Sequence, residues 1–169
     1  MAPSSRLSRS NLLPAAVWLL LPAIGRAAES CPWMNPATAG GLLGGAVTLT
    51  VTHENANRDD AACDFIREGG NVISELRIGV QTMDPPRSEY TAHAAECGAD
   101  TMPLKAIGNE AVVCSPDEGN GGKRSARVVG RVRNRIFTIL VGTTDSAATR
   151  DSLREKARAA AEQVAGNLF

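Results

Sequence analysis

Residues 62–83 read ACDFIREGGNVISELRIGVQTM, and this stretch decides the fold class of the chain. Apolar and polar residues alternate around Cys63 and Phe65, which is the two-residue period of a half-buried β-strand. The glycine pair at 69–70 predicts a hairpin turn into a second, longer strand. The apolar phase of that strand slips near Ser74, and a β-bulge would account for the slip. The stretch therefore predicts part of an antiparallel sheet.

Segments on both sides of this hairpin extend the sheet and add helices. One earlier and three later segments are strand-like, at 46–53, 105–115, 124–134 and 135–144. Helical spacing and helix-start signals predict an N-terminal, a central and a C-terminal helix. The predicted order is helix, three strands, helix, three strands, helix. This order defines an α+β domain, a single antiparallel β-sheet of about six strands flanked by the three helices.

Each predicted helix has its own signals. Asn35 followed by Pro36 predicts an N-cap and a first helical residue. The central helix is predicted to begin at Ser88 and to turn inward Tyr90, Ala94 and Cys97. Either Asp145 or Ser146 is predicted to cap the C-terminal helix, whose apolar face carries Leu153, Ala157, Ala160, Val164 and Leu168.

Residues 1–27 have the three zones of a secretory signal peptide: basic residues, the apolar run 12–24, and small residues up to Ala27. The apolar run contains two prolines and is shorter than the roughly 20 residues of a membrane span. We therefore expect the segment to be removed, leaving one domain at 28–169. Lipid attachment to Cys31 is the alternative, but the acidic Glu29 departs from the lipoprotein pattern. We expect no stable membrane anchor after cleavage.

The whole chain carries 18 basic and 18 acidic residues, and loss of the arginines in 1–27 leaves an excess of acids. This charge balance does not favour nucleic acid as a partner. All four cysteines follow the predicted signal peptide, and an even number in an oxidising compartment predicts two disulfides. Of the three possible pairings we favour the one that joins neighbours along the chain, Cys31 with Cys63 and Cys97 with Cys114.

No catalytic, metal or cofactor site is predicted. The cysteines lack the C-x-x-C spacing of zinc or thiol redox sites. His53 beside Glu54, and His93 near Glu96, are the two pairs that could start acid–base chemistry. A histidine base needs an orienting partner and a nucleophile, and no motif such as G-x-S-x-G supplies one.

The candidate binding residues are three arginines in the predicted strand 124–134. Alternation places Arg127, Arg131 and Arg133 on one face, where guanidinium groups could hold a carboxylate or phosphate. The alternative is a solvated face whose charges are balanced by acids on neighbouring strands.

Three segments carry a resemblance to known proteins: CPWMNPATAGGLLGG at 31–45, Cys63-x-Phe65, and LKAIGNEAVVC at 104–114. With these features the chain resembles uncharacterised small exported bacterial proteins, among them actinobacterial lipoprotein domains of unknown function with a PsbP-like fold. The resemblance covers most of 31–168. It implies a curved antiparallel sheet with flanking helices and a location in the cell envelope, and it implies no reaction.

These observations predict a non-enzymatic binding or accessory domain in the periplasm or outside the cell. The expected partner is an envelope protein or a small anionic ligand. The alternative is a small periplasmic hydrolase that uses a histidine and a carboxylate. A pocket that joins His53 or His93 to an ionised carboxylate would favour the hydrolase, and a basic face around Arg131 would favour the binding domain.

Overall fold

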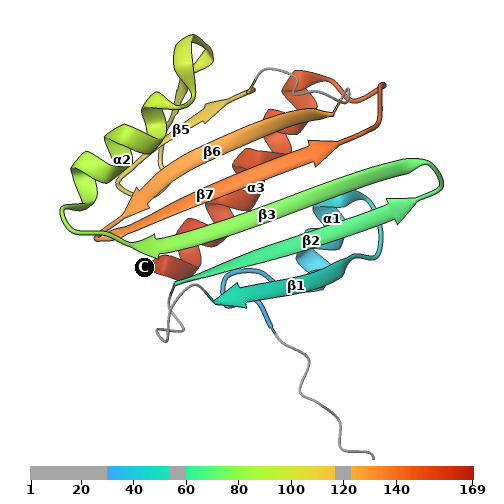
Figure 1. Cartoon of the computed structure of the whole chain (residues 1–169), viewed down its shortest axis with the longest axis horizontal. Helices are drawn as coiled ribbons and strands as arrows, with labels where there is room; N and C mark the ends of the chain where they lie inside the picture. The colour runs from blue at the N-terminus through green and yellow to red at the C-terminus, as the bar shows by residue number, and fades with distance from the viewer. Residues whose placement is uncertain (1–29, 54–59, 117–122) are drawn as a thin grey trace, which may run out of the picture.

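The computed structural model describes residues 30–53, 60–116 and 123–169, which form one antiparallel sheet and three α-helices (Figure 1). The helices are α1 (Pro36–Leu43), α2 (Pro86–Ala95) and α3 (Arg150–Leu168), and a short 3-10 helix, Gly98–Asp100, follows α2. The strands are β1 (Thr48–His53), β2 (Ala61–Gly69), β3 (Val72–Thr82), β4 (Met102–Leu104), β5 (Glu110–Cys114), β6 (Arg124–Val132) and β7 (Arg135–Thr143). The predicted signal peptide at 1–27 lies outside the described residues.

The strand order across the sheet is β1-β2-β3-β7-β6-β5-β4, and every neighbouring pair is antiparallel. Strands β1 to β3 form one meander, and β4 to β7 form another. The segment containing α2 links the two meanders along the chain, and the ladder between β3 and β7 joins them at the centre of the sheet. The predicted α+β class with a single antiparallel sheet is confirmed.

The hairpin between β2 and β3 turns at Gly70, whose φ of +61° is one that glycine adopts without strain. The cross-strand pairing continues without a break from this turn to Ala61, which lies opposite Val80. The β-bulge suggested near Ser74 is therefore wrong. Ser74 is 9% exposed and keeps the inward phase of the strand, so the apparent slip is a polar residue at a core-facing position.

The sheet has one strand more than the six predicted. The additional strand, β4, is only three residues long and pairs with β5 at the edge of the sheet. It contains Pro103, which cannot donate a backbone hydrogen bond and is tolerated at a sheet edge. A strand this short has no alternating pattern that sequence analysis could detect.

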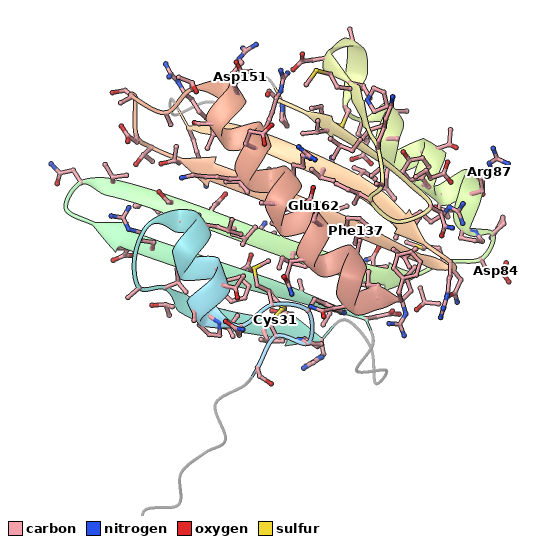
Figure 2. All side chains as sticks on the ribbon, turned by 180° about the vertical axis from the view of Figure 1, so that it is seen from behind. Cys31, Asp84, Arg87, Phe137, Asp151 and Glu162 are labelled. Carbon is pink, nitrogen blue, oxygen red and sulfur yellow. A yellow bond between two sulfur atoms is a disulfide. The ribbon has the colours of Figure 1, made fainter. Side chains whose placement is uncertain are left out.

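The main core lies on one face of the sheet, beneath α1 and α3. Figure 2 shows α3 running across the strands with α1 beside it. The buried positions of α3 include all five of its predicted apolar face, Leu153, Ala157, Ala160, Val164 and Leu168. They meet a sheet face whose fully buried side chains include Phe65, Leu76, Ile78, Phe137 and Ile139. The predicted packing of the C-terminal helix on the sheet is confirmed.

On the opposite face, α2 lies over β6 and β7 at one end of the sheet (Figure 1). A second buried cluster there contains Tyr90, Cys97, Cys114, Val129 and Ile136. The predicted inner face of α2 is confirmed, although the helix begins at Pro86 and not at Ser88. Within the described ranges no helix covers this face over β1, β2 and β3 (Figure 1), where Ile66 and Ile73 are exposed.

Side-chain caps fix the starts of α1 and α3. Asn35 caps α1 as predicted, because its Oδ1 accepts a hydrogen bond from the backbone N–H of Thr38 at 2.8 Å. The predicted cap of α3 at Asp145 or Ser146 is wrong. Thr149 is the cap, and its Oγ1 accepts from the N–H of Ser152 at 3.1 Å. The residues before it form a turn that precedes the helix.

We expect Thr149→Ala to lower the free energy of unfolding by about 1 kcal/mol, because the mutation leaves a backbone N–H of the first turn without its acceptor. Chemical denaturation monitored by circular dichroism measures the change. Ser146→Ala is the matched control and should leave the midpoint unchanged. Equal losses in the two variants would contradict the assignment of Thr149 as the cap.

Both predicted disulfides are present, Cys31–Cys63 and Cys97–Cys114, and no described cysteine is free. The first ties the segment before α1 to β2, and the second ties the segment after α2 to β5. Two disulfides indicate an oxidising, non-cytoplasmic location. Among the described helices, none has the length and apolar character needed to cross a membrane.

Candidate ligand-binding site

The three arginines predicted as a basic ladder do not form one. Arg127 and Arg131 share the face of β6 that carries Val129, which packs with the residues of α2. Arg133 lies beyond the end of β6, in the turn to β7, with a φ of +56°. Its backbone N–H donates to Oδ1 of Asn109 at 2.6 Å. The prediction that Arg133 shares the strand face is wrong because the tight turn begins one residue earlier than the alternation suggested.

Arg131 is paired with an acid of the neighbouring strand. Its Nε donates to Oε1 of Glu110 at 2.6 Å, and the two residues are direct cross-strand partners. Its Nη1 donates to the carbonyl oxygen of Arg133 at 2.8 Å. Tyr90 lies close to this pair, and burial is the main cause that raises the pKa of its hydroxyl. The alternative interpretation, a face balanced by acids of neighbouring strands, describes Arg131 well.

Arg127 is paired with an acid near the end of α2. Its Nη1 lies 2.7 Å from Oε2 of Glu96, and this hydrogen bond holds the pKa of the Glu96 carboxyl below its usual value. Only 24% of the Arg127 side chain is exposed, whereas 52% of the Glu96 side chain is. An exposed carboxylate is held weakly, because solvent screens the pair. Arg127 can therefore exchange this partner for another anion.

A second arginine, Arg77 on β3, lies across β7 from Arg127. Both residues pair in register with Leu140, so the row Arg77, Leu140, Arg127 crosses three adjacent strands on one face. The Nε of Arg77 donates to Oδ1 of Asp64 on β2, and this bond raises the pKa of the guanidinium above its usual value. The Arg77 side chain is 59% exposed. The strand pairing therefore places two guanidinium groups on either side of one residue of β7.

Two adjoining hollows, of about 250 and 360 Å³, lie on this face and share Arg77, Arg127 and Thr138 as lining residues. We call the two hollows together the arginine groove. The first extends toward α2, and the residues that line it include Ala62, Gly79, His93 and Ile136. The second extends the other way, and the residues that line it include Pro116, Ser125 and Leu140. The groove thus has a largely apolar lining with two cationic side chains at its middle.

Small residues at the bottom of the arginine groove give it its depth. Gly79 lies opposite both Ala62 and Thr138 in the sheet. A Cβ atom built at Gly79 would lie 3.0 Å from Oγ1 of Thr138, so even an alanine would fill space here. The φ of this glycine is not in the left-handed region, so backbone strain does not require it. The residue type therefore preserves the shape of the groove.

The two histidines have different surroundings. His53 ends β1 on an exposed position, and its predicted partner Glu54 lies outside the described residues. His93 of α2 lines the arginine groove, and its Nδ1 lies 3.3 Å from Oε1 of Glu96 without hydrogen-bond geometry. His93 therefore adds an imidazole ring to the end of the groove nearest α2.

The described part of the chain contains no group of three or more His, Cys, Asp or Glu residues that could hold a metal ion. Since all four cysteines are in disulfides, no thiol is available as a nucleophile. The groups that the groove offers a ligand are guanidinium, imidazole, hydroxyl and apolar side chains. Groups of this kind are able to hold an anion by hydrogen bonds and charge.

One side of the arginine groove was predictable from the sequence, and the other was not. Arg127 was a predicted binding residue, but Arg77, Gly79 and Thr138 were not. They come together because β3 pairs with β7, and the two strands are separated by α2 and three other strands along the chain. In the structure Arg77 is exposed between the buried Leu76 and Ile78, so it lies on the sheet face opposite the main core. Nothing in the local sequence indicates which strand lies beside it.

No family model, curated protein or solved structure matches this chain. The resemblance to lipoprotein domains with a PsbP-like fold therefore stays a prediction.

Proposed function

We propose that this protein is an exported, non-enzymatic binding domain that holds a small amphipathic organic anion in the arginine groove. The observation that carries the proposal is the row Arg77, Leu140, Arg127, which places two guanidinium groups on either side of an apolar strand position. The signal peptide at 1–27 would deliver the domain to the periplasm or the cell exterior. The two disulfides support such a compartment.

The two arginines suit a carboxylate, sulfonate or phosphate group. Guanidinium groups form charge-assisted, often bidentate hydrogen bonds with such anions. An anion above Leu140 would be approached from two strands, by Arg77 on one side and Arg127 on the other. A single arginine on a flat sheet could not enclose it in this way.

The two hollows suit the apolar part of the ligand. Their volumes, about 250 and 360 Å³, together fall in the range of small-molecule sites. Ile136 and the small residues Ala62 and Gly79 line the first hollow, and Leu140 and Pro116 line the second. A ligand with a central or terminal anionic group and a flat or slender apolar body would bury both parts at once.

Asp64 and Glu96 compete with the ligand, because each is already paired with one of the two arginines. The pKa of Glu96 is lowered in the folded protein, so its ion pair is present above the usual carboxyl pKa and is lost as the pH falls through the lowered value. Below that pH, Arg127 is released. Anion binding should therefore strengthen on acidification for any ligand that keeps its charge.

The probe that tests the proposal is 8-anilinonaphthalene-1-sulfonate, an aromatic anion whose fluorescence rises in an apolar site. We expect Arg77→Ala and Arg127→Ala each to weaken its binding about tenfold, the loss of one charge-assisted hydrogen bond. Glu96→Gln should strengthen binding at neutral pH because it frees Arg127. A fluorescence titration of the oxidised protein at fixed ionic strength measures all three.

Arg87→Ala is the matched control, since it removes an equal charge from an exposed position of α2 that does not line the groove (Figure 2). Its binding curve should overlay that of the unmodified protein. If Arg77→Ala and Arg127→Ala bind the probe as well as Arg87→Ala does, the proposed site is wrong. Weaker binding by Glu96→Gln would show that Glu96 does not compete for Arg127.

A small periplasmic hydrolase is the second candidate, and the contact between His93 and Glu96 beside the groove favours it. Among the residues lining that hollow, Thr138 is the one with a hydroxyl group. Hydrolysis of 4-nitrophenyl esters that His93→Gln abolishes would support the hydrolase and contradict a purely binding role.

A further inference from the structure

A small polar cavity lies on the other side of the sheet, between α1, α3 and the paired ends of β3 and β7. Its volume is about 100 Å³, and the residues that line it include Arg67, Ser74, Thr143, Asp145 and Lys156. We call it the α1–α3 cavity. It has room for a single small group and not for the amphipathic ligand of the arginine groove.

Arg67 contributes a guanidinium group that has no carboxylate within ion-pair distance among the described residues. Its position is set by two glycines. A Cβ atom built at Gly45 would lie 2.8 Å from the Arg67 Nε, and one built at Gly69 would lie 3.1 Å from a terminal nitrogen. Neither glycine has a φ in the left-handed region, so their residue type leaves room for Arg67.

Lys156 of α3 contributes a second cation, and it too forms no ion pair with a described residue. This is unlike Arg77, Arg127 and Arg131, which each have a carboxylate partner. Two cations from different elements that line one cavity repel each other unless an anion lies between them. Even with the carboxylate of Asp145, which lines the same cavity, the two cations leave one positive charge in excess, so the lining attracts an anion.

Hydroxyl groups complete one side of the cavity. The Oγ of Ser74 and the Oγ1 of Thr143 are 3.1 Å apart and both residues are buried. Thr143 Oγ1 can also donate to the carbonyl oxygen of Ile73 at 3.3 Å, and it accepts from the N–H of Asp145 at 3.2 Å. When Thr143 donates to Ser74 and not to Ile73, the Ser74 hydroxyl keeps its own hydrogen for a ligand. This accounts for a serine at a core-facing position of β3.

Asp145 lines the same cavity, and this carboxylate decides which anion fits. Its Oδ1 accepts from the N–H of Ala147 at 2.9 Å, and the side chain forms no ion pair with a described residue. A fully deprotonated anion beside it is repelled. Phosphate keeps a proton near neutral pH and can donate it in a hydrogen bond to a carboxylate, whereas sulfate cannot.

We propose that the α1–α3 cavity binds inorganic phosphate in preference to sulfate. Arg67, Lys156 and Ser74 donate to the phosphate oxygens, and Asp145 accepts from the phosphate hydroxyl. This site is separate from the arginine groove, which lies on the opposite face of the sheet. Its occupancy therefore does not depend on the ligand of the groove.

Isothermal titration of the oxidised protein with inorganic phosphate, and separately with sulfate, tests the proposal. We expect phosphate to bind with higher affinity than sulfate. Arg67→Ala and Lys156→Ala should each weaken phosphate binding by about tenfold or more, as expected for the loss of a charge-assisted hydrogen bond. Asp145→Asn should reduce the preference for phosphate over sulfate.

Gly45→Ala keeps every charge but places a methyl group against Arg67, so it should also weaken phosphate binding. Weaker binding by Gly45→Ala could not result from a lost charge. It would also show that a loss of binding in Arg67→Ala does not merely reflect misfolding of that variant. Arg158→Ala, on the same helix, and Arg87→Ala, on α2 and away from both sites, are the controls and should bind phosphate normally. Absent phosphate binding at millimolar concentration, or binding that Arg67→Ala and Lys156→Ala leave unchanged, would overturn the proposal.

Discussion

Replacing Phe137 by alanine is expected to lower the free energy of unfolding by about 3 to 5 kcal/mol, the range for removing a fully buried aromatic ring. Phe137 of β7, labelled in Figure 2, has no exposed surface. It lies directly opposite Gly130 of β6 in the sheet. A Cβ atom built at Gly130 would lie only 2.2 Å from Cζ of the ring. The ring therefore occupies the space of the missing side chain, and its loss leaves a cavity beneath α3.

A double-mutant cycle makes this prediction specific. Gly130→Ala alone should be destabilising by about 1 to 3 kcal/mol, because the new methyl group overpacks the core against Phe137. Combined with Phe137→Ala, the same methyl group should be neutral or stabilising, because it partly fills the cavity. Urea denaturation gives the four free energies of unfolding. Additive effects of the two mutations would show that the ring does not lie across Gly130.

Removing the Cys31–Cys63 disulfide by a double alanine substitution is expected to cost about 3.5 kcal/mol, the loop-entropy estimate for a bridge that closes a loop of 32 residues. The bridge at Cys31 (Figure 2) holds the segment before α1 against β2. This segment includes the buried Trp33 and Met34. Asn167 of α3 adds one hydrogen bond to it, from Nδ2 to the carbonyl oxygen of Trp33 at 2.8 Å. One such bond cannot replace the covalent link.

Trp33 provides a local measurement of the same change. The chain has two tryptophans, and the other, Trp18, lies in the predicted signal peptide. In the cleaved protein, fluorescence therefore reports on Trp33, and its emission should shift to longer wavelength at lower denaturant in the double variant. The Cys97→Ala/Cys114→Ala variant is the control: its Trp33 emission should shift together with the loss of circular dichroism signal, whereas without Cys31–Cys63 the emission should shift first. Unchanged stability without Cys31–Cys63 would contradict the prediction.

Local sequence patterns predicted the elements that depend on interactions between residues close together in the sequence. The two-residue period of β2, the apolar face of α3 and the cap at Asn35 depend on neighbours in the chain, and the structure confirms them. The pairing of cysteines followed from their spacing in the same way. The predictions that failed concern residues whose role depends on contacts with segments distant in the sequence. The sequence suggests a β-bulge near Ser74, because the role of a hydroxyl group at a core-facing position becomes clear only from the cavity that it lines.

The candidate site was less predictable than the fold. The alternation of β6 placed Arg127 and Arg131 correctly on one face, but it extended the strand into the turn at Arg133. It could not show that Glu96 and Glu110 would neutralise them, because those contacts depend on the docking of α2 and the pairing of β5 with β6. Arg77 is the neighbour of Arg127 across β7 because β3 pairs with β7, and this pairing, which joins the two meanders, is not visible in the local sequence.

The strand order has a consequence for how the chain acquires its native state. Each disulfide closes within one meander and its adjoining helix or segment, and neither crosses from β3 to β7. Each half can therefore be oxidised on its own, before the halves have met. Contacts within a half are close in sequence and form early, whereas the central ladder waits for closure of a long loop. We expect the rate of folding to be set by the meeting of two already cross-linked halves.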